Sequence, residues 1–202
     1  MRAMKLLVLI ALVGLATSSC RSPALRVENI PIARDATFDL LPPSALGKSV
    51  SLEQIVEARA GEREFSFHCL LEVEPKRLVL VGMTPFNTRA FTIELADDEL
   101  SIDIAPGAQL PAEPSRILAD LQLALWPEPE VRGLERSELL GDCGFGGLNR
   151  LRTFGRGKEP VIVVLYAEPS TDLPWAGRIE LKNLERRYTL QVTTVRAEEL
   201  AP

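Results

Sequence analysis

Apolar and polar residues alternate along several short segments of the chain, and this period of two is typical of β-strands with one buried face. The clearest segment is residues 65–73, where the apolar residues Phe65, Phe67, Cys69, Leu71 and Val73 share one face. The residues between them are mainly polar or charged. The pattern predicts a strand whose second face is exposed to water.

Short polar loops separate further apolar segments and determine how the strands pair. A four-residue hairpin loop sets which residues lie opposite each other, and residues 74–77, 96–99 and 184–187 fit such loops. The loops pair Val73 with Leu78, Leu95 with Leu100, and Asn183 with Tyr188. Residues 150–154 form a weaker strand pattern, and residues 161–167 are apolar on both faces, which predicts a strand covered on both sides. Together these segments predict an antiparallel meander with one continuous apolar face.

One stretch has helical periodicity. Ser115 can cap a helix that ends at Trp126, because the residue before Pro127 avoids the helical conformation. Apolar residues recur at helical spacing in Ile117, Leu118, Leu121, Ala124 and Leu125. We expect this helix to cover the concave face of a curved sheet. Residues 51–54 have the Ser-x-x-Gln form of a capping box but also alternate as a strand, and we prefer the strand.

The turn at residues 84–88, Thr-Pro-Phe-Asn-Thr, has a large apolar residue at its tip. It connects β-forming residues 78–81 with the alternating residues 91–95. Turn tips normally face water and carry Gly, Asn, Asp or Pro. An exposed Phe86 therefore needs either a pocket in its own protein or a non-aqueous phase outside it.

The N-terminus has the layout of a bacterial secretory signal. Residues 1–5 carry two basic side chains, and residues 6–15 are apolar, a length of about half the roughly twenty residues that span a bilayer. The small residues that lead to Cys20 resemble the lipobox of bacterial lipoproteins, although Thr17 stands where that motif usually has Leu. The resemblance implies cleavage before Cys20, acyl lipid on Cys20 and, because Arg21 replaces the retention signal Asp, an outer-membrane location on the periplasmic side. An ordinary secreted protein is the alternative.

The signal divides the chain into three parts. We expect residues 1–19 to be the signal peptide, residues 20–46 a lipid-anchored tether, and residues 47–202 one domain with its own core. The net charge is −5 for the chain and −7 without residues 1–19, which carry two basic and no acidic residues. An acidic chain with few aromatic residues is a poor candidate for binding nucleic acid.

Residues suited to catalysis are scarce. Alternation points the single histidine, His68, away from Cys69, so the two do not form a nucleophile and base pair. The chain has no Gly-x-Ser-x-Gly and no His-Glu-x-x-His, and the glycines of residues 144–147 and 155–158 lack the rest of a dinucleotide or phosphate loop. We expect no enzyme activity, no metal site and no cofactor apart from the acyl lipid on Cys20.

Residues 77–104 resemble LolB, the outer-membrane lipoprotein receptor. That family has Asn-Pro-Leu-Gly-Ser between two strands, where this chain has Thr-Pro-Phe-Asn-Thr. The helix end at residues 125–127 and the hairpin at residues 179–194 are also similar, so the match covers most of residues 54–194. The chain is more similar still to a group of uncharacterised LolB-like lipoproteins, through Gln54, Arg89-Ala90-Phe91, Leu118-Ala119-Asp120-Leu121 and Trp126-Pro127.

The resemblance implies a mainly β (α+β) fold, an unclosed antiparallel barrel or strongly curved sheet with a helical lid over an apolar cavity. It implies a membrane-inserting loop, here Pro85, Phe86 and Asn87, with Phe86 in place of the family's Leu. The cavity would accept the acyl chains of a lipoprotein or lipid from a periplasmic LolA-like carrier or a lipid exporter. From the predicted faces we expect it to be formed by Phe65, Phe67, Leu71, Leu80, Phe91, Ile93, Ile102, Ile117, Leu121 and Leu125.

Three functions from different classes stay open. The first is a factor that delivers an acylated cargo to the outer membrane, the second a module that only binds a lipid or a protein, and the third a structural lipoprotein with a filled core. We also expect a disulfide between Cys69 and Cys143, the two thiols left once Cys20 is lipidated, because the cell envelope is oxidising. A buried free Cys69 with an exposed Cys143 is the alternative.

Overall fold

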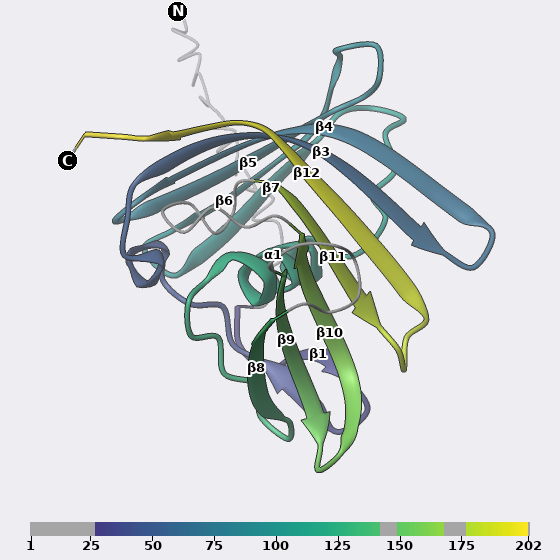
Figure 1. Cartoon of the computed structure of the whole chain (residues 1–202). Coiled ribbons are helices and arrows are strands. Elements are labelled where there is room, and N and C mark those ends of the chain that lie inside the picture. The colour runs from purple at the N-terminus through teal and green to yellow at the C-terminus, as the bar shows by residue number, and fades with distance from the viewer. Residues whose placement is uncertain (1–26, 142–148, 168–176, 202) are drawn as a thin grey trace, which may run out of the picture.

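The main element of the protein is one antiparallel sheet of ten strands. The computed structural model describes residues 27–141, 149–167 and 177–201. Along the sheet the order is β7-β6-β5-β4-β3-β12-β11-β10-β9-β8 (Figure 1). The bounds are β3 Val50–Ala60, β4 Arg63–Glu74, β5 Arg77–Met83, β6 Arg89–Ala96, β7 Glu99–Ile104, β8 Glu135–Gly141, β9 Asn149–Arg156, β10 Glu159–Ala167, β11 Arg178–Asn183 and β12 Tyr188–Glu199. Within the described residues the edge strands β7 and β8 do not pair, so the sheet is open.

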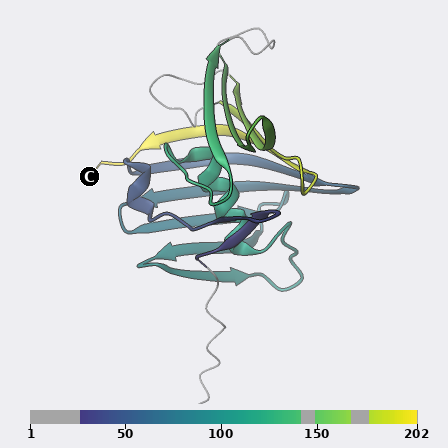
Figure 2. The same cartoon turned by 90° about the horizontal axis from the view of Figure 1, so that it is seen from below.

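The sheet is strongly bent, and the helix α1 (Pro114–Leu125) lies on its concave side. In Figure 1, β3 to β7 form the upper part and β8 to β10 turn away below them, with α1 between the two parts. Seen from below, the green strands β8 to β10 stand across the direction of the other strands (Figure 2). The predicted mainly β fold with an unclosed antiparallel sheet is confirmed.

The strand registers agree with those predicted from loop length. Val73 pairs with Leu78, Leu95 with Leu100, and Asn183 with Tyr188. The capping-box residues 51–54 lie in β3, so the strand that we preferred there is confirmed. Residues 150–154 and 161–167 lie in β9 and β10, and in residues 161–167 every side chain is buried or half-buried. The period of two and the short loops are thus enough to fix this part of the sheet.

The helix begins at Pro114, one residue before its predicted cap, Ser115. Glu113 is the N-cap, Pro114 is the first helical residue, and Ser115 is buried in the first turn without a capping role. Proline fits this first position because its fixed φ is helical and no partner is needed for an N–H. The helix ends before Trp126, whose ψ of 145° is extended, as Pro127 predicts.

Side chains from β9 and β10 hold the C-terminal end of α1. The buried Arg152 donates hydrogen bonds from Nη1 to the carbonyls of Leu123 (2.9 Å) and Trp126 (2.7 Å). The hydroxyl of Tyr166 donates to the carbonyl of Ala124 (2.5 Å). The last carbonyls of a helix have no partner inside it, so these bonds both satisfy them and fix α1 against the sheet.

Part of the predicted tether belongs to the folded domain. Strands β1 (Ile30–Ala33) and β2 (Ala36–Phe38) form a two-stranded hairpin, and a 3-10 helix, η1, covers Pro43–Leu46. Ile30, Ile32 and Phe38 are at most 2% exposed, and the hairpin packs against α1. The chain therefore joins the core well before residue 47, while residues 20–26 lie outside the described part.

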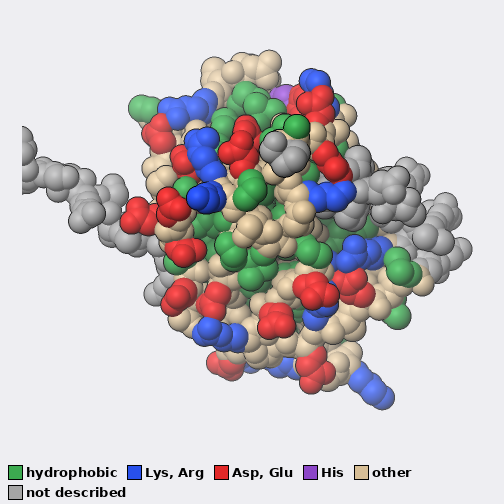
Figure 3. All heavy atoms as spheres, turned by 90° about the vertical axis from the view of Figure 1, so that its left-hand side faces the viewer, with side chains coloured by type: hydrophobic (Ala, Val, Ile, Leu, Met, Phe, Trp, Pro, Cys, Tyr) green, Lys and Arg blue, Asp and Glu red, His purple; other side chains and the backbone are tan. Residues whose placement is uncertain are grey.

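The apolar face is filled at one end of the sheet, where Val50, Leu71, Val73 and Leu78 are at most 1% exposed. This is the left-hand end in Figure 1, where the C-terminal end of β12 also lies. Figure 3 views the molecule from that side and shows acidic and basic side chains interspersed over its surface.

Within the described residues, no helix combines the length and hydrophobicity that a membrane crossing requires.

Candidate functional site

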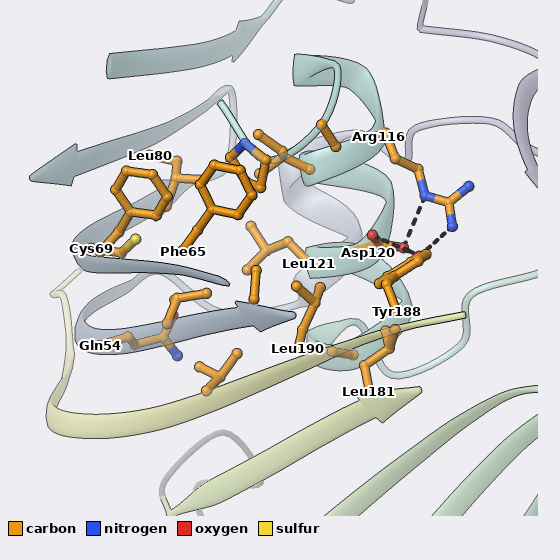
Figure 4. Close-up of a pocket in the computed structure, with 18 of the residues that line it drawn as sticks. Gln54, Phe65, Cys69, Leu80, Arg116, Asp120, Leu121, Leu181, Tyr188 and Leu190 are labelled. Atoms are coloured by element: carbon orange, nitrogen blue, oxygen red, sulfur yellow. Dashed lines mark hydrogen bonds and ion pairs between the residues drawn. The ribbon is translucent and has the colours of Figure 1, made fainter. Parts of the chain in front are cut away.

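An apolar cavity of about 450 Å³ lies between the concave face of the sheet and α1 (Figure 4). Strands β3 to β6, β11 and β12 supply one wall. The helix α1 and the two residues Pro111 and Ala112 before it supply the other. Most of the lining is aliphatic or aromatic, and the polar side chains are Gln54, Arg59, Arg116, Asp120, Arg186 and the hydroxyl of Tyr188. The cavity is therefore apolar along most of its wall, with charged groups at particular points.

The cavity is bounded by seven of the ten residues expected there, Phe65, Phe67, Leu80, Phe91, Ile117, Leu121 and Leu125. Leu71, Ile93 and Ile102 do not line it. They share the same apolar face but lie toward its filled end, where Leu71 and Ile93 are at most 1% exposed and Ile102 packs against the core. The alternation of residues predicts the face, whereas the position along the strand decides whether the face is hollow or filled.

Small side chains keep the space open. Ala58 on β3 and Ala124 on α1 line it and fill little of it. On β5, Gly82 pairs with Phe91 of β6, and a Cβ at Gly82 would lie 2.2 Å from the Phe91 ring. The ring therefore occupies the position that a Cβ would take, and it meets Phe67 edge to face with 5.4 Å between the ring centroids. Gly82 thus lets an aromatic wall residue lie close to the sheet.

A buried polar cluster of Arg116, Asp120 and Tyr188 interrupts the apolar wall (Figure 4). Arg116 Nε donates to Asp120 Oδ1 (3.2 Å), and Arg116 Nη2 donates to the Tyr188 hydroxyl. That hydroxyl donates in turn to Asp120 Oδ1 (2.8 Å) and Oδ2 (2.9 Å). Arg116 Nη1 donates to the carbonyl of Pro31 in β1 (2.8 Å). The cluster joins α1 to both β12 and the N-terminal hairpin.

Burial and charge determine the protonation of Arg116 and Tyr188. Burial acts to lower the pKa of Arg116, but the opposite charge of Asp120 and the contact with Tyr188 outweigh it and raise that pKa. Burial, together with the charge of Asp120, raises the pKa of the Tyr188 hydroxyl. Burial also raises the pKa of Asp120, while the charge of Arg116 opposes this shift. At neutral pH Arg116 is a cation and Tyr188 is neutral.

The turn with Phe86 at its tip adjoins the cavity wall. It connects β5 and β6, and Phe91 of β6, which pairs with Gly82 of β5, lines the cavity. Phe86 is 88% exposed, so its side chain lies outside the core. The backbone N–H groups of Thr84 and Asn87 donate to the carbonyls of Thr88 and Thr84, both at 2.9 Å. These bonds give the tip a defined shape, and Pro85, Phe86 and Asn87 stand together at its apex.

Cys69 lines the cavity as a free thiol, and burial raises its pKa to about 12. Cys20 and Cys143 lie outside the described residues, so the lipid anchor and the disulfide with Cys143 stay predictions. His68 lies on the other face of β4, where its Nε2 is 2.8 Å from Glu53 Oε1. It is thus directed away from Cys69, as the alternation predicts.

The described residues contain no group of three or more His, Cys, Asp and Glu arranged to hold a metal ion. Sequence reasoning missed the polar members of the site, namely Arg116, Asp120 and Tyr188. The spacing of Arg116 and Asp120, four apart on one helix, is a signal for a pair. Nothing local connects either residue to Tyr188, which follows Asp120 by 68 positions.

Residues 51–196 match the model of a family described as a protein of unknown function, DUF3261. The chain belongs to this family. The matched residues of the DUF3261 model run from β3 to β12 and include every wall of the cavity, whereas the β1–β2 hairpin lies before them. No curated protein matches the chain. Membership of DUF3261 is compatible with the uncharacterised LolB-like group and assigns no activity, so the function is argued from the site.

Proposed function

We propose that this protein is an outer-membrane lipoprotein that accepts an acylated cargo, a lipoprotein or a lipid, in the cavity and delivers it to the membrane. The observation that carries the proposal is an open apolar cavity beside a defined turn with an exposed Phe86. Cargo binding needs the first feature and delivery needs the second. A lipid-anchored Cys20 would keep both next to the membrane.

The size and chemistry of the cavity support an acyl chain as its occupant. Small-molecule sites are concave, mainly apolar and roughly 300 to 1,000 Å³ in volume, and this cavity measures about 450 Å³. A water molecule takes up roughly 30 Å³ in the liquid, and a methylene group is of similar size, so the cavity has room for on the order of 15 methylene groups. One long acyl chain therefore fits, and a second would require the walls to move apart.

The exposed Phe86 supports delivery rather than storage. A Phe side chain in water loses roughly 1.5 to 3 kcal/mol relative to an apolar phase, and the hydrogen-bonded turn at residues 84–88 holds this side chain at 88% exposure. Contact with a bilayer would recover that energy beside the cavity. A module that only binds a lipid has no use for such a tip, which makes binding alone the second candidate.

The proposal is tested first by asking what the cavity holds. A Cys20→Ser variant of the full chain, purified without detergent and analysed by native mass spectrometry, should retain an acyl lipid. Ala58→Phe should abolish this binding because the new ring occupies the cavity, and it should leave the melting temperature nearly unchanged because open space receives it. Glu57→Phe places the same ring on the opposite, exposed face of β3 and should retain the lipid.

Transfer separates delivery from binding. Donor vesicles contain a fluorescent acyl lipid and a quencher that stays behind. The fluorescent lipid should move to acceptor vesicles faster when the Cys20→Ser protein is present. Ala58→Phe should not accelerate this exchange, whereas Glu57→Phe should. A protein that binds the lipid but does not accelerate exchange is a binding module. The protein is a structural lipoprotein if it binds no acyl lipid and if Ala58→Phe lowers its free energy of unfolding by roughly 1 to 3 kcal/mol, as overpacking of a filled core does.

A further inference from the structure

The charged residues on the cavity wall are mostly basic, although the whole chain is acidic. Arg59, Arg116 and Arg186 line the cavity, and Asp120 is the acidic residue among its lining side chains. The chain as a whole has a net charge of −5. A basic lining in an acidic protein indicates that the cavity has a preference for the charge of what it binds.

Two of these arginines lie side by side. Arg116 Nη1 and Arg186 Nη2 both donate to the carbonyl oxygen of Pro31, each at 2.8 Å. The backbone N–H of Arg186 donates to Asn183 Oδ1 (2.9 Å), and the buried Asn183 donates from Nδ2 to the carbonyl of Ile32 (2.9 Å). The β11–β12 turn is therefore tied to the N-terminal hairpin, and this brings the second guanidinium next to the first.

The positive charge at this point exceeds the negative charge. Asp120 lies between Arg116 and Tyr188 and balances one arginine. Arg186 donates to a neutral carbonyl, and the other donors of its guanidinium have no side-chain partner among the described residues. Arg59 and Arg186 are both exposed, but Arg59 pairs with Glu64 at 2.8 Å and is therefore excluded from this count.

The polar groups gather at one side of the cavity. Arg116 lies in the first turn of α1, after the N-cap Glu113. Arg116, Asp120 and Tyr188 lie together there, whereas Phe65 and Leu80 lie at the other side (Figure 4). Arg186 lines the cavity from the β11–β12 turn, next to Arg116.

We propose that Arg186, together with Arg116, binds the carboxylate of a single-chain amphiphile, a long-chain fatty acid, whose hydrocarbon chain occupies the cavity. This inference rests on the proposed function and names the ligand class. Guanidinium groups bind carboxylates through paired hydrogen bonds. Each guanidinium nitrogen of Arg116 already donates to Asp120, Tyr188 or Pro31, so Arg186 supplies most of the donors for this carboxylate. A monoanion also loses less hydration free energy on entering a partly buried site than a phosphate dianion does.

The test compares head groups of equal chain length. Hexadecanoate, hexadecanol and hexadecyl phosphate are titrated against the Cys20→Ser full chain loaded with N-phenylnaphthylamine, an apolar fluorescent probe. We expect hexadecanoate to displace the probe at about tenfold lower concentration than hexadecanol, as a charge-assisted hydrogen bond implies. Arg186→Gln should remove this advantage and leave the affinity for hexadecanol unchanged.

Arg187 supplies a matched control. It is the next residue in the same turn, it is exposed, and it does not line the cavity. Arg187→Gln removes the same charge from the protein and should retain the preference for hexadecanoate. A melting curve of each variant checks that the turn still folds. If Arg186→Gln proves unstable, the comparison of hexadecanoate with hexadecanol on the Cys20→Ser protein, whose turn is unchanged, still decides whether the cavity prefers a carboxylate.

Each outcome supports or overturns the inference. Equal binding of acid and alcohol overturns the carboxylate site and leaves the acyl cavity intact. Tighter binding of hexadecyl phosphate than of hexadecanoate overturns the choice of carboxylate. If Arg186→Gln and Arg187→Gln lose the preference for hexadecanoate equally, the preference comes from the net charge of the protein, and this too overturns the inference. Displacement of the probe by none of the three contradicts the proposed function itself.

Discussion

Truncation of Phe86 to alanine tests whether this side chain contacts a membrane or belongs to the core. Phe86 is 88% exposed, whereas Phe154 on β9 is 0% exposed. Phe86→Ala removes apolar surface that water already contacts, so the free energy of unfolding should change by less than about 0.5 kcal/mol. Phe154→Ala should lower it by about 3 to 5 kcal/mol, the range for truncation of a buried Phe.

Melting temperatures convert these energies into a measurement. For a domain of this size 1 kcal/mol corresponds to about 2 to 4 °C. Phe86→Ala should therefore shift the melting temperature by less than about 2 °C, and Phe154→Ala should lower it by about 6 to 20 °C. Both are made in the Cys20→Ser full chain and compared by circular dichroism.

Vesicle transfer measures what Phe86 does outside the core. Loss of roughly 1.5 to 3 kcal/mol of bilayer contact should slow acyl transfer by about tenfold or more, while cargo binding stays unchanged. Phe86→Trp should retain transfer and report insertion by a blue shift of its fluorescence when vesicles are added. Unchanged transfer with Phe86→Ala would refute the reasoning, as would a loss of melting temperature equal to that of Phe154→Ala.

Three further predictions concern the cavity and its buried groups. Gly82→Ala should push the Phe91 ring, 2.2 Å from the new Cβ, into the cavity, which weakens probe binding and costs about 1 to 3 kcal/mol of stability by overpacking; unchanged binding would contradict it. Asp120→Asn leaves the buried Arg116 without its counter-charge and should lower the free energy of unfolding in urea by about 3 to 5 kcal/mol; a loss under about 1 kcal/mol would contradict it. In reduced protein the pKa of Cys69 is about 12, against 9.0 for an ordinary cysteine, so stability should fall as the pH rises above 9.0, because the unfolded chain releases the proton first. Cys69→Ser should reduce this slope and leave the part that the raised pKa of Tyr188 contributes; an unchanged slope would contradict it. Alkylation of unfolded, unreduced protein that labels Cys69 would exclude the bridge to Cys143.

Most of the sheet could be predicted because its signals are local. Alternation has the period of a strand, and a loop of fixed length sets a register, so Val73 opposite Leu78 follows from residues 65–78 alone. The end of α1 is equally local, since Pro127 acts on its neighbour Trp126.

The short and edge strands could not be predicted in the same way. Strands β1 and β2 have four and three residues, too few to show a period, and their prolines and charges favour a tether. Strand β8 lies at the sheet edge, where the adjacent Leu139 and Leu140 are 63% and 74% exposed. An edge strand with apolar residues on both faces has no alternation to detect.

The sequence predicts which side chains share the apolar face of the sheet, but it does not predict which of them border the open volume of the cavity. Whether Leu71 or Ile93 meets open space depends on what packs opposite, and that is set by the bend of the sheet and by the β1–β2 hairpin. The charged cluster is harder still, because it joins Arg116 and Tyr188 across the fold. Such contacts depend on tertiary structure that no local pattern contains.

The position of the terminal strands has a consequence for folding kinetics. The first and last strands of the large sheet, β3 and β12, pair at its centre, where Val50 lies opposite Glu199. This pair joins the half that contains β4 to β7 with the half that contains β8 to β11. Contacts between residues so far apart in sequence form slowly, on timescales of milliseconds to seconds in all-β domains. Each half can form its hairpins early, but the cavity closes only after the last strand of the chain has been delivered.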